Sequence, residues 1–439
     1  MRIHTKIKYY FQSLKKQKVQ TSMSAFCHLS SSKASLGYYQ LNFLREKINK
    51  FDSIYYFIRS TFSIMSQNLL ISNNKLHQRS YDCLCITWGR LENFVKDGSF
   101  YDRYFNQNSK KNKKILWCII YSGEKLPKKI NDNIIILSTP KSYNMFNFFL
   151  ALFKEIIFCL NNPTNFFHRF TSQSYFARKI SKTLLTKINL SVIKKIIIPY
   201  EGQPFQNYLI FCIKKYFPHI RTLGYLHYAH PLQLDIFHRE GSPDLLLTHS
   251  ADQKKYIIKN LQWKKNKVCL VKSARFRKSF DKKKISNMVF LPYYIDDKEN
   301  LLRNLENFLK KVKIKSLPIL KVKKHPFPYN QSVQIEVSKL ISKILNKYNY
   351  KFDNKNKKKV IIVIGLSTTP LLALEKNIKV YHLTQDRELE LFSNTFWPSL
   401  YTKKIIDNCY LYFLRRKNYC IKLGNSNADY LQKYLKNNN

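Results

Sequence analysis

One carboxylate in this sequence stands where it could act as a general base. Glu201 comes after the apolar run 195–199 and Tyr200, and it precedes Gly202. A partly desolvated carboxylate can take the proton from an attacking hydroxyl group. We therefore take Glu201 as the candidate catalytic residue. A structural salt bridge to one of the many lysines is the alternative.

Two further groups of residues have the chemistry to bind phosphate. The first group is Lys323, His325 and Pro326. Lysine and histidine side chains can donate hydrogen bonds to a diphosphate, and proline fixes the turn that aims the imidazole. The same residues could instead be structural, because a single histidine usually is.

The second phosphate group is a hydroxyl-rich turn of Ser367, Thr368 and Thr369 before Pro370. We expect Thr369 to be the N-cap of a helix and Pro370 to be its first residue. Free backbone N–H groups at such a helix start, together with the hydroxyls, bind phosphate. The alternative is that Thr369 only caps the helix.

Other polar residues at the ends of apolar runs would line a substrate site; they are Trp88, Gly89, Arg90, Gln203, His227 and His230. A histidine pair with H-x-x-H spacing and no carboxylate or cysteine pair beside it is a weak metal pattern. The chain also has no D-x-D triplet, no G-x-G-x-x-G and no P-loop. We therefore expect neither a metal nor a bound cofactor. The motifs that usually bind dinucleotides and ATP are absent from the sequence.

Short apolar runs precede all of these residues and alternate with helical stretches. The first series comprises 81–87, 115–120, 134–137, 195–199, 222–227, 245–248 and 268–271; the second comprises 288–292, 319–323, 360–364 and 379–383. Runs of this length and spacing predict parallel strands joined by crossover helices. We expect two Rossmann-like, doubly wound α/β domains, with ligands bound beyond the carboxyl ends of their strands, in a cleft between them.

Four segments follow from this pattern. They are a basic, helical N-terminal extension (1–75), an N-terminal Rossmann-like domain with the catalytic base (76–280), a C-terminal Rossmann-like domain for the nucleotide (281–400) and a helical C-terminal tail (401–439). The lysine-rich stretch 276–285 lacks apolar periodicity and marks the break between the two domains. The extension has twelve lysines and arginines but only two acids, Glu46 and Asp52.

The charge of the chain points to an anionic partner. Its 439 residues include 77 lysines and arginines against 27 acids, a net charge of +50. Nucleic acid, an anionic membrane surface or phosphorylated substrates would suit this charge, although compositional bias toward Lys, Asn, Ile, Tyr and Phe also produces it. Because no nucleic-acid-binding module and no aromatic–basic surface pattern is found, nucleic-acid binding is the alternative and an anionic membrane surface the expected partner.

Cysteine usage and hydropathy indicate the cytoplasm. The nine cysteines form no C-x-x-C, and Cys83 and Cys85 share one strand face, which is too rigid for a mutual disulfide. We expect no signal peptide, and the most apolar helical stretch, 145–160, is too short to span a membrane. The sequence therefore predicts a cytoplasmic protein that is peripheral on the inner face of the cytoplasmic membrane.

Several of these patterns, in this order, resemble known families. Tyr200–Gly202, Lys323–Pro326 and Ser367–Thr369 resemble motifs of bacterial GT-B glycosyltransferases, namely the sialyltransferase, polysialyltransferase and capsular Kdo-transferase families. The stretches 87–89, 97–105 and 200–204 also resemble a family of surface carbohydrate biosynthesis proteins. The resemblance covers roughly residues 81–396.

The resemblance implies roles for individual residues. Glu201 would be the general base, and His325, Ser367 and Thr368 would hold the nucleotide's phosphate. Tyr200 stands where these families often have a second acid, which is a departure from their pattern.

The activity that the resemblance implies is inverting, metal-independent transfer of a sugar from a nucleotide-sugar donor. The acceptor would be lipid-linked or a polysaccharide, in capsule or lipopolysaccharide synthesis. Phosphoryl transfer from a CDP-polyol, or an inactive fold that acts as an assembly partner, remain alternatives.

Overall fold

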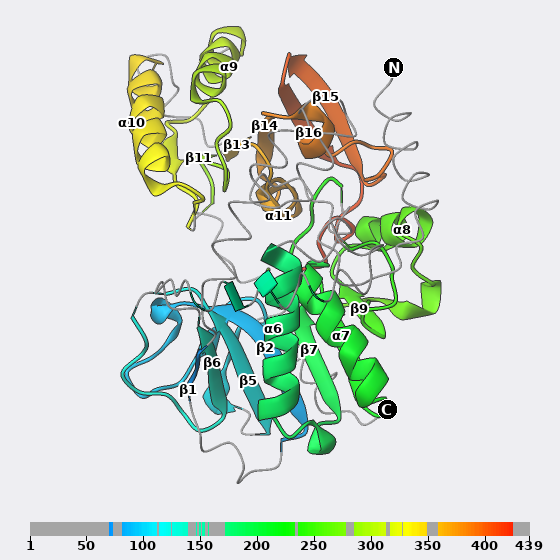
Figure 1. Cartoon of the computed structure of the whole chain (residues 1–439). Helices are drawn as coiled ribbons and strands as arrows, with labels where there is room; N and C mark the ends of the chain where they lie inside the picture. The colour runs from blue at the N-terminus through cyan, green and yellow to red at the C-terminus, as the bar shows by residue number, and fades with distance from the viewer. Residues whose placement is uncertain are drawn as a thin grey trace.

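Every apolar run that was predicted to be a strand contains one in the computed structural model (Figure 1). The structure describes residues 70–72, 81–111, 114–123, 125–138, 146, 149–150, 152–153, 157, 172–232, 236–277, 285–312, 317–326, 328–348 and 359–424. The chain is a mixed α/β protein with two mainly parallel sheets, which confirms the predicted fold class at this level.

The first sheet has the strand order of a doubly wound fold. Its strands are β1 (Leu70–Ser72), β2 (Cys83–Gly89), β5 (Ile115–Tyr121), β6 (Ile134–Ser138), β7 (Lys195–Pro199), β8 (Arg221–Tyr225), β9 (Leu245–Thr248) and β10 (Val268–Leu270). They are ordered β1-β6-β5-β2-β7-β8-β9-β10, and only β1 is antiparallel to its neighbour. The order reverses between β2 and β7. Ligands of doubly wound sheets bind at such a switch point.

The second sheet has a switch point of its own. Its strands are β11 (Met288–Phe290), β12 (Lys321–Lys323), β13 (Val360–Ile364), β14 (Lys379–Leu383), β15 (Leu400–Ile406) and β16 (Cys409–Leu414). The order is β12-β11-β13-β14-β16-β15, in which the first four strands are parallel. The reversal lies between β11 and β13, so ligand contacts are expected from the residues that follow these two strands.

Helices cover the sheets as the crossover connections require. The first unit has α6 (Ser172–Lys187), α7 (Pro204–Tyr216) and α8 (Ala251–Asn260); the second has α9 (Lys298–Lys311), α10 (Gln331–Tyr348), α11 (Thr369–Glu375) and α12 (Arg387–Glu390). In α9 the buried residues Leu301, Leu305 and Phe308 recur every three or four positions and face the sheet. Figure 1 shows α9 and α10 beside each other in the upper unit.

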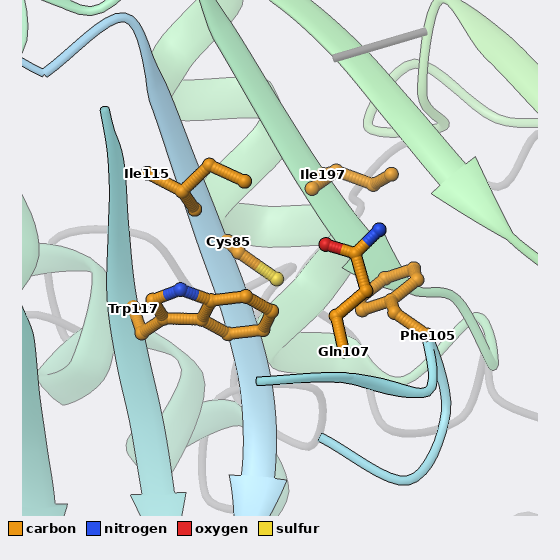
Figure 2. Close-up of a pocket in the computed structure, with 6 residues that line it drawn as sticks. All are labelled: Cys85, Phe105, Gln107, Ile115, Trp117 and Ile197. Atoms are coloured by element: carbon orange, nitrogen blue, oxygen red, sulfur yellow. The ribbon is translucent and has the colours of Figure 1, made fainter. Parts of the chain in front are cut away.

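Buried apolar side chains fill both faces of the first sheet. All five residues of β7 are buried, which is why this strand reads as one continuous apolar run. One void of about 10 Å³ lies in this core; it is lined by Cys85, Phe105, Gln107, Ile115, Trp117 and Ile197 (Figure 2). It has room for a water molecule at most, so a nucleotide must bind elsewhere.

The predicted helical C-terminal tail is wrong for residues 401–424. Residues 400–414 form the β15–β16 hairpin on the edge of the second sheet, where the aromatic-rich strand Cys409–Leu414 pairs antiparallel with β14. The predicted boundary at residue 400 therefore cuts the second unit too short. The following chain returns to the first unit, where Lys422 N donates to His249 O at 2.6 Å. Residues 425–439 lie outside the described part.

The N-terminal prediction can be compared at one place only. Within the predicted helical extension, Leu70–Ser72 is the strand β1 and pairs with β6, so these residues belong to the first sheet. The other residues of 1–75 lie outside the described part. None of the described helices combines the length with the hydropathy that a membrane span requires.

Among the described residues, hydrogen bonds made by the side chains of Asp252, Trp397 and Thr368 are some of those that join the two units. The Asp252 carboxylate at the start of α8 accepts from Ser399 N at 2.9 Å and from Ser399 Oγ at 3.0 Å. The Trp397 indole donates to Pro231 O at 3.1 Å. Thr368 Oγ1 accepts from Ala229 N at 3.1 Å and donates to Ala229 O at 3.2 Å. The two sheets therefore sit against each other at defined residues.

A buried acid in the second unit makes stability depend on pH. Glu390 is 8% exposed, Gln385 N donates to its Oε2 at 2.7 Å, and burial raises the pKa of Glu390 to about 8. In the unfolded chain this group loses its proton near the ordinary value of 4.5. The unfolded state thus binds fewer protons between pH 4.5 and 8, and this group lowers stability as pH rises through that window.

Glu390→Gln is expected to remove this dependence. Glutamine keeps an acceptor for Gln385 N but cannot ionise, so the variant should match wild type near pH 4.5. It should be more stable at pH 9, by up to about 5 kcal/mol. Urea unfolding at the two pH values measures this, with the exposed Glu92→Gln as control. An equal stability difference at both pH values would show that Glu390 is ionised in the folded protein.

Candidate functional site

The candidate base stands at the switch point of the first sheet. β2 and β7 pair there in parallel, and the turn that carries Glu201 follows β7 directly. Side chains of α7 fix this turn: the Gln206 amide oxygen accepts from the backbone N of Glu201 at 2.9 Å, and its nitrogen donates to Pro199 O at 2.8 Å. Gly202 has a φ of 68°, a conformation that favours glycine. The turn after β7 is therefore held in one shape.

Two neighbours hold the carboxylate of Glu201. Gln203 Nε2 donates to Oε2 at 2.6 Å, and His227 Nε2 lies 3.3 Å from Oε1. Burial alone would raise the pKa of Glu201, but the hydrogen bonds from His227 and Gln203 outweigh burial and lower it. Burial lowers the pKa of His227, so the imidazole is neutral at neutral pH and its Nε2–H donates to an ionised carboxylate.

The same geometry decides which member of this pair can act as base. His227 is 4% exposed, and its Nδ1 is buried with no hydrogen-bond partner in the described structure. The Glu201 side chain is 28% exposed. A hydroxyl group of a substrate can therefore approach Glu201 but not the lone pair of His227. His227 is a positioning residue, and Glu201 is the group that can take a proton.

The loop 97–105, part of the family resemblance, forms one wall of the site. Asp102 is fully buried and accepts from Thr87 Oγ1 and from Phe105 N at 2.6 Å, which fixes the loop against the end of β2. The loop brings the Tyr104 ring to 4.4 Å from the His227 ring. The charge of Glu201 adds to burial in raising the pKa of Tyr104. Tyr104 was not predicted as a site residue, although its loop carried the resemblance.

Arg275 is a second site residue that sequence reasoning missed. It follows β10, beside Ala274, whose backbone N donates to the Tyr225 hydroxyl at 3.0 Å and whose carbonyl accepts from Asn106 Nδ2 at 3.4 Å. The Arg275 side chain is exposed, yet the protein atoms around it displace part of its hydration shell. This loss of hydration lowers the pKa of Arg275, whereas the charge of Glu201 raises it. Its strand-end position was the one available signal.

The strand ends of the second unit bring an aromatic group to the same region. Tyr293 follows β11 at the second switch point, and its ring lies 5.6 Å from the His325 ring. Burial and the neighbouring Tyr329 raise the pKa of Tyr293. Two charges of the first unit also change this pKa: Arg90 lowers it and Glu201 raises it. Tyr293 thus lies within electrostatic range of the first unit's site. Its position directly after the predicted strand 288–292 was the one available signal in the sequence.

His325 is half-buried after β12, and its backbone N donates to Gln334 Oε1 at 3.3 Å. Pro326 is exposed next to it. Lys323 is exposed at the end of β12, with its Nζ 5.5 Å from the centre of the Phe290 ring. The predicted phosphate residues of this strand end are therefore accessible to a ligand.

The hydroxyl turn differs in detail from the prediction. The N-cap of α11 is Thr368 rather than Thr369, and no side-chain capping bond forms. Thr368 donates its hydroxyl proton to Ala229 O, so this proton is not available to a phosphate oxygen. The Ser367 hydroxyl instead lies 2.9 Å from that of Thr369 and accepts from Thr369 N at 3.1 Å. Thr368 joins the units, while Ser367 and Thr369 keep the turn's shape.

The remaining lining residues have mixed positions. The Trp88 ring packs edge-on against Tyr104 at 5.6 Å, and His230 is half-buried with its ring 4.3 Å from that of Tyr228. Burial lowers the pKa of His230 to about 4. Arg90 is exposed and donates from Nε to Ser122 Oγ at 3.2 Å. Gly89 is the last residue of β2 and is buried, so it is part of the sheet and does not line the site.

Metal ligands do not gather in the described part of the chain. No group of three or more His, Cys, Asp or Glu side chains there could hold a metal ion. The seven described cysteines are all free, and six of them are buried.

Fold and site together define an α/β protein with two switch-point edges and an accessible carboxylate at the first of them. No protein-family model matches the chain, and no curated protein matches it. Its function is therefore argued from the site itself.

Proposed function

We propose that this protein is a glycosyltransferase that moves a sugar from a nucleotide-sugar donor to a lipid-linked or polysaccharide acceptor in bacterial surface carbohydrate synthesis. The observation that carries the proposal is the ionised, accessible carboxylate of Glu201, which Gln203 and His227 hold at the switch point of the first sheet. A carboxylate in this state is ready to accept a proton, which is the task of a general base.

In this mechanism the acceptor hydroxyl attacks the anomeric carbon while Glu201 takes its proton. The bond from that carbon to the donor phosphate breaks, and the nucleotide leaves with the electron pair. The new bond forms on the opposite face of the sugar, so the configuration inverts. Glu201 returns its proton to solvent after the product leaves.

The leaving phosphate needs positive charge, since its negative charge increases in the transition state. Arg275 lies within electrostatic range of Glu201, and Lys323 and His325 supply further donors from the second unit. These groups would allow transfer without a metal ion. In this proposal the nucleotide occupies the ends of β11–β13 and the acceptor the ends of β2 and β7, at the inner face of the cytoplasmic membrane.

A nucleotide panel tests the donor half of the proposal. Thermal shift with CMP, CDP, UDP and GDP should show one selective stabiliser. His325→Ala and Lys323→Ala should each weaken its binding about tenfold, because a hydrogen bond to a charged group contributes about 1.5–3 kcal/mol. The exposed His219→Ala is the matched control. Unchanged affinity in both variants would contradict this site. Salt-sensitive binding of any oligonucleotide, with no nucleotide effect, would favour a nucleic-acid-binding protein.

A further inference from the structure

The chain after β8 passes from the first unit into the second. This bridging segment (226–231) is held in the first unit at Tyr228, whose carbonyl accepts from Gln253 Nε2 at 3.0 Å. The next residue, Ala229, is fully buried and is part of the hydrophobic cluster of the second unit that contains Leu371. Two consecutive residues of the bridging segment therefore contact different units.

One hydroxyl group of the second unit holds Ala229 by its backbone. Thr368 Oγ1 accepts from Ala229 N at 3.1 Å and donates to Ala229 O at 3.2 Å. A buried residue needs partners for its N–H and its carbonyl, and this side chain supplies both. Further along the same segment, the Trp397 indole donates to Pro231 O at 3.1 Å. The second unit thus fixes the later half of the bridging segment.

The earlier half of the bridging segment carries the residue that holds the candidate base. His227 Nε2 lies 3.3 Å from Glu201 Oε1. Two residues of chain span at most about 7 Å, so a displacement of Ala229 reaches His227. The distance of 3.3 Å is already slightly longer than the usual range of about 2.7–3.2 Å for an N–H···O bond. A small shift of the imidazole is therefore enough to weaken the bond.

Thr368 also belongs to the proposed phosphate turn. It is the N-cap of α11, and its neighbours on either side are the hydroxyl residues Ser367 and Thr369. A ligand that orders this turn therefore also fixes the hydroxyl group that holds Ala229.

We propose that Thr368 is a positioning residue, which holds His227 against Glu201 from the second unit by way of Ala229. The two halves of the candidate site are then aligned through one side chain, and the base is held only while the phosphate turn is in place. The role of Glu201 as a base rests on the proposed function, whereas the contacts through Thr368 and Ala229 do not.

Loss of this support should raise the pKa of Glu201. Burial raises that pKa and the hydrogen bond from His227 lowers it, so burial dominates once the bond is lost. The acidic limb of the pH profile of kcat/KM, which reports the base of the free enzyme, should then move to higher pH. No substitution below removes any of the other titratable groups that interact electrostatically with Glu201, which are His230, Tyr104, Arg275 and Tyr293.

Thr368→Val tests the proposal, because valine has nearly the volume of threonine but no hydroxyl group. Thr368→Ser is the rescue variant, because serine keeps the hydroxyl. In the valine variant kcat should fall about tenfold or more, since a misplacement of about 1 Å can cost about 10²-fold in rate. The acidic limb of its profile should lie at higher pH. The serine variant should stay close to wild type in both measurements.

Ser399→Ala is the matched control. It also removes a hydroxyl bond between the units, the 3.0 Å bond to Asp252 in α8, which lies outside the bridging segment. This control should keep the kcat and the pH profile of wild type. If it shifts the profile as Thr368→Val does, the effect is a general loosening of the two units and the proposal is overturned.

Nitrogen NMR of the histidine rings gives a readout that needs no substrate. In Thr368→Val the ring signals of His227 should differ from those of wild type, and in Thr368→Ser they should return. Unchanged ring signals in the valine variant would overturn the proposal whether or not the protein transfers a sugar.

Inorganic pyrophosphate provides a test on the wild-type protein, which does not depend on the folding of a variant. Pyrophosphate should shift the amide signal of Ser367 together with the ring signals of His227. A shift of Ser367 alone would overturn the proposal. No shift of Ser367 would instead contradict the phosphate site of the proposed function, and the NMR comparison of the valine and serine variants would then decide the role of Thr368.

Discussion

Glu201→Gln should lower kcat for sugar transfer by about 10²–10⁴, the usual contribution of a general base. Glutamine has nearly the same size as glutamate, and its oxygen can still accept one of the two hydrogen bonds that Gln203 and His227 give to the carboxylate. It cannot accept the proton of the acceptor hydroxyl. The effect should therefore fall on the chemical step, with donor binding and melting temperature close to wild type.

The assay uses the nucleotide-sugar whose nucleotide stabilises the protein, and it follows product release with and without EDTA. Transfer by wild type should persist in EDTA. Glu240→Gln, an exposed carboxylate of the same unit, is the control and should keep full activity. Near-normal turnover by Glu201→Gln would contradict the proposed mechanism. A large fall in its melting temperature would instead make Glu201 part of a structural polar pair.

Asp252→Ala should destabilise the protein by about 2–4 kcal/mol, the largest loss of stability that we expect. Asp252 is fully buried, and its carboxylate accepts both bonds from Ser399 of the other unit. Alanine would leave the Ser399 N–H buried without its acceptor, and a buried unsatisfied group costs about 1–3 kcal/mol. The substitution also removes an acid from the first turn of α8.

Urea unfolding measures this loss. Asp252→Asn is the matched control, because its amide oxygen can still accept from Ser399 N while its amide nitrogen faces the hydroxyl. The asparagine variant should lose less than half as much stability as the alanine variant. A loss below about 0.5 kcal/mol for Asp252→Ala would mean that Asp252 does not help to hold the two units together.

The parallel strands were predictable because each is buried on both faces. β7, β9 and β13 match the predicted ranges to the residue, since Ile, Val and Leu fill them almost without interruption. The β15–β16 hairpin escaped prediction because it mixes lysines with aromatic residues and stands at a sheet edge. There, packing against β14 decides the conformation more than the sequence pattern does.

Polar residues at strand ends were also visible in the sequence, because the parallel arrangement sends every strand's carboxyl end to one edge. On that basis Glu201, Gln203 and His227 could be named as candidates, and the structure brings all three into contact. The sequence did not show which of these residues is the base and which ones hold it in place. Only the burial of His227 Nδ1 makes this residue the support of Glu201 and not the base.

The sequence by itself determined two parallel α/β units and the set of polar residues at their strand ends, since both follow from local runs and their spacing. The tertiary structure alone decided which of those residues meet. Thr368 and Ala229 are 139 positions apart, and their contact exists only because the two sheets pack against each other. The charge of Glu201 likewise raises the pKa of Tyr293 only because the two units pack together. Such long-range contacts depend on how whole elements pack together, and no local sequence pattern encodes them.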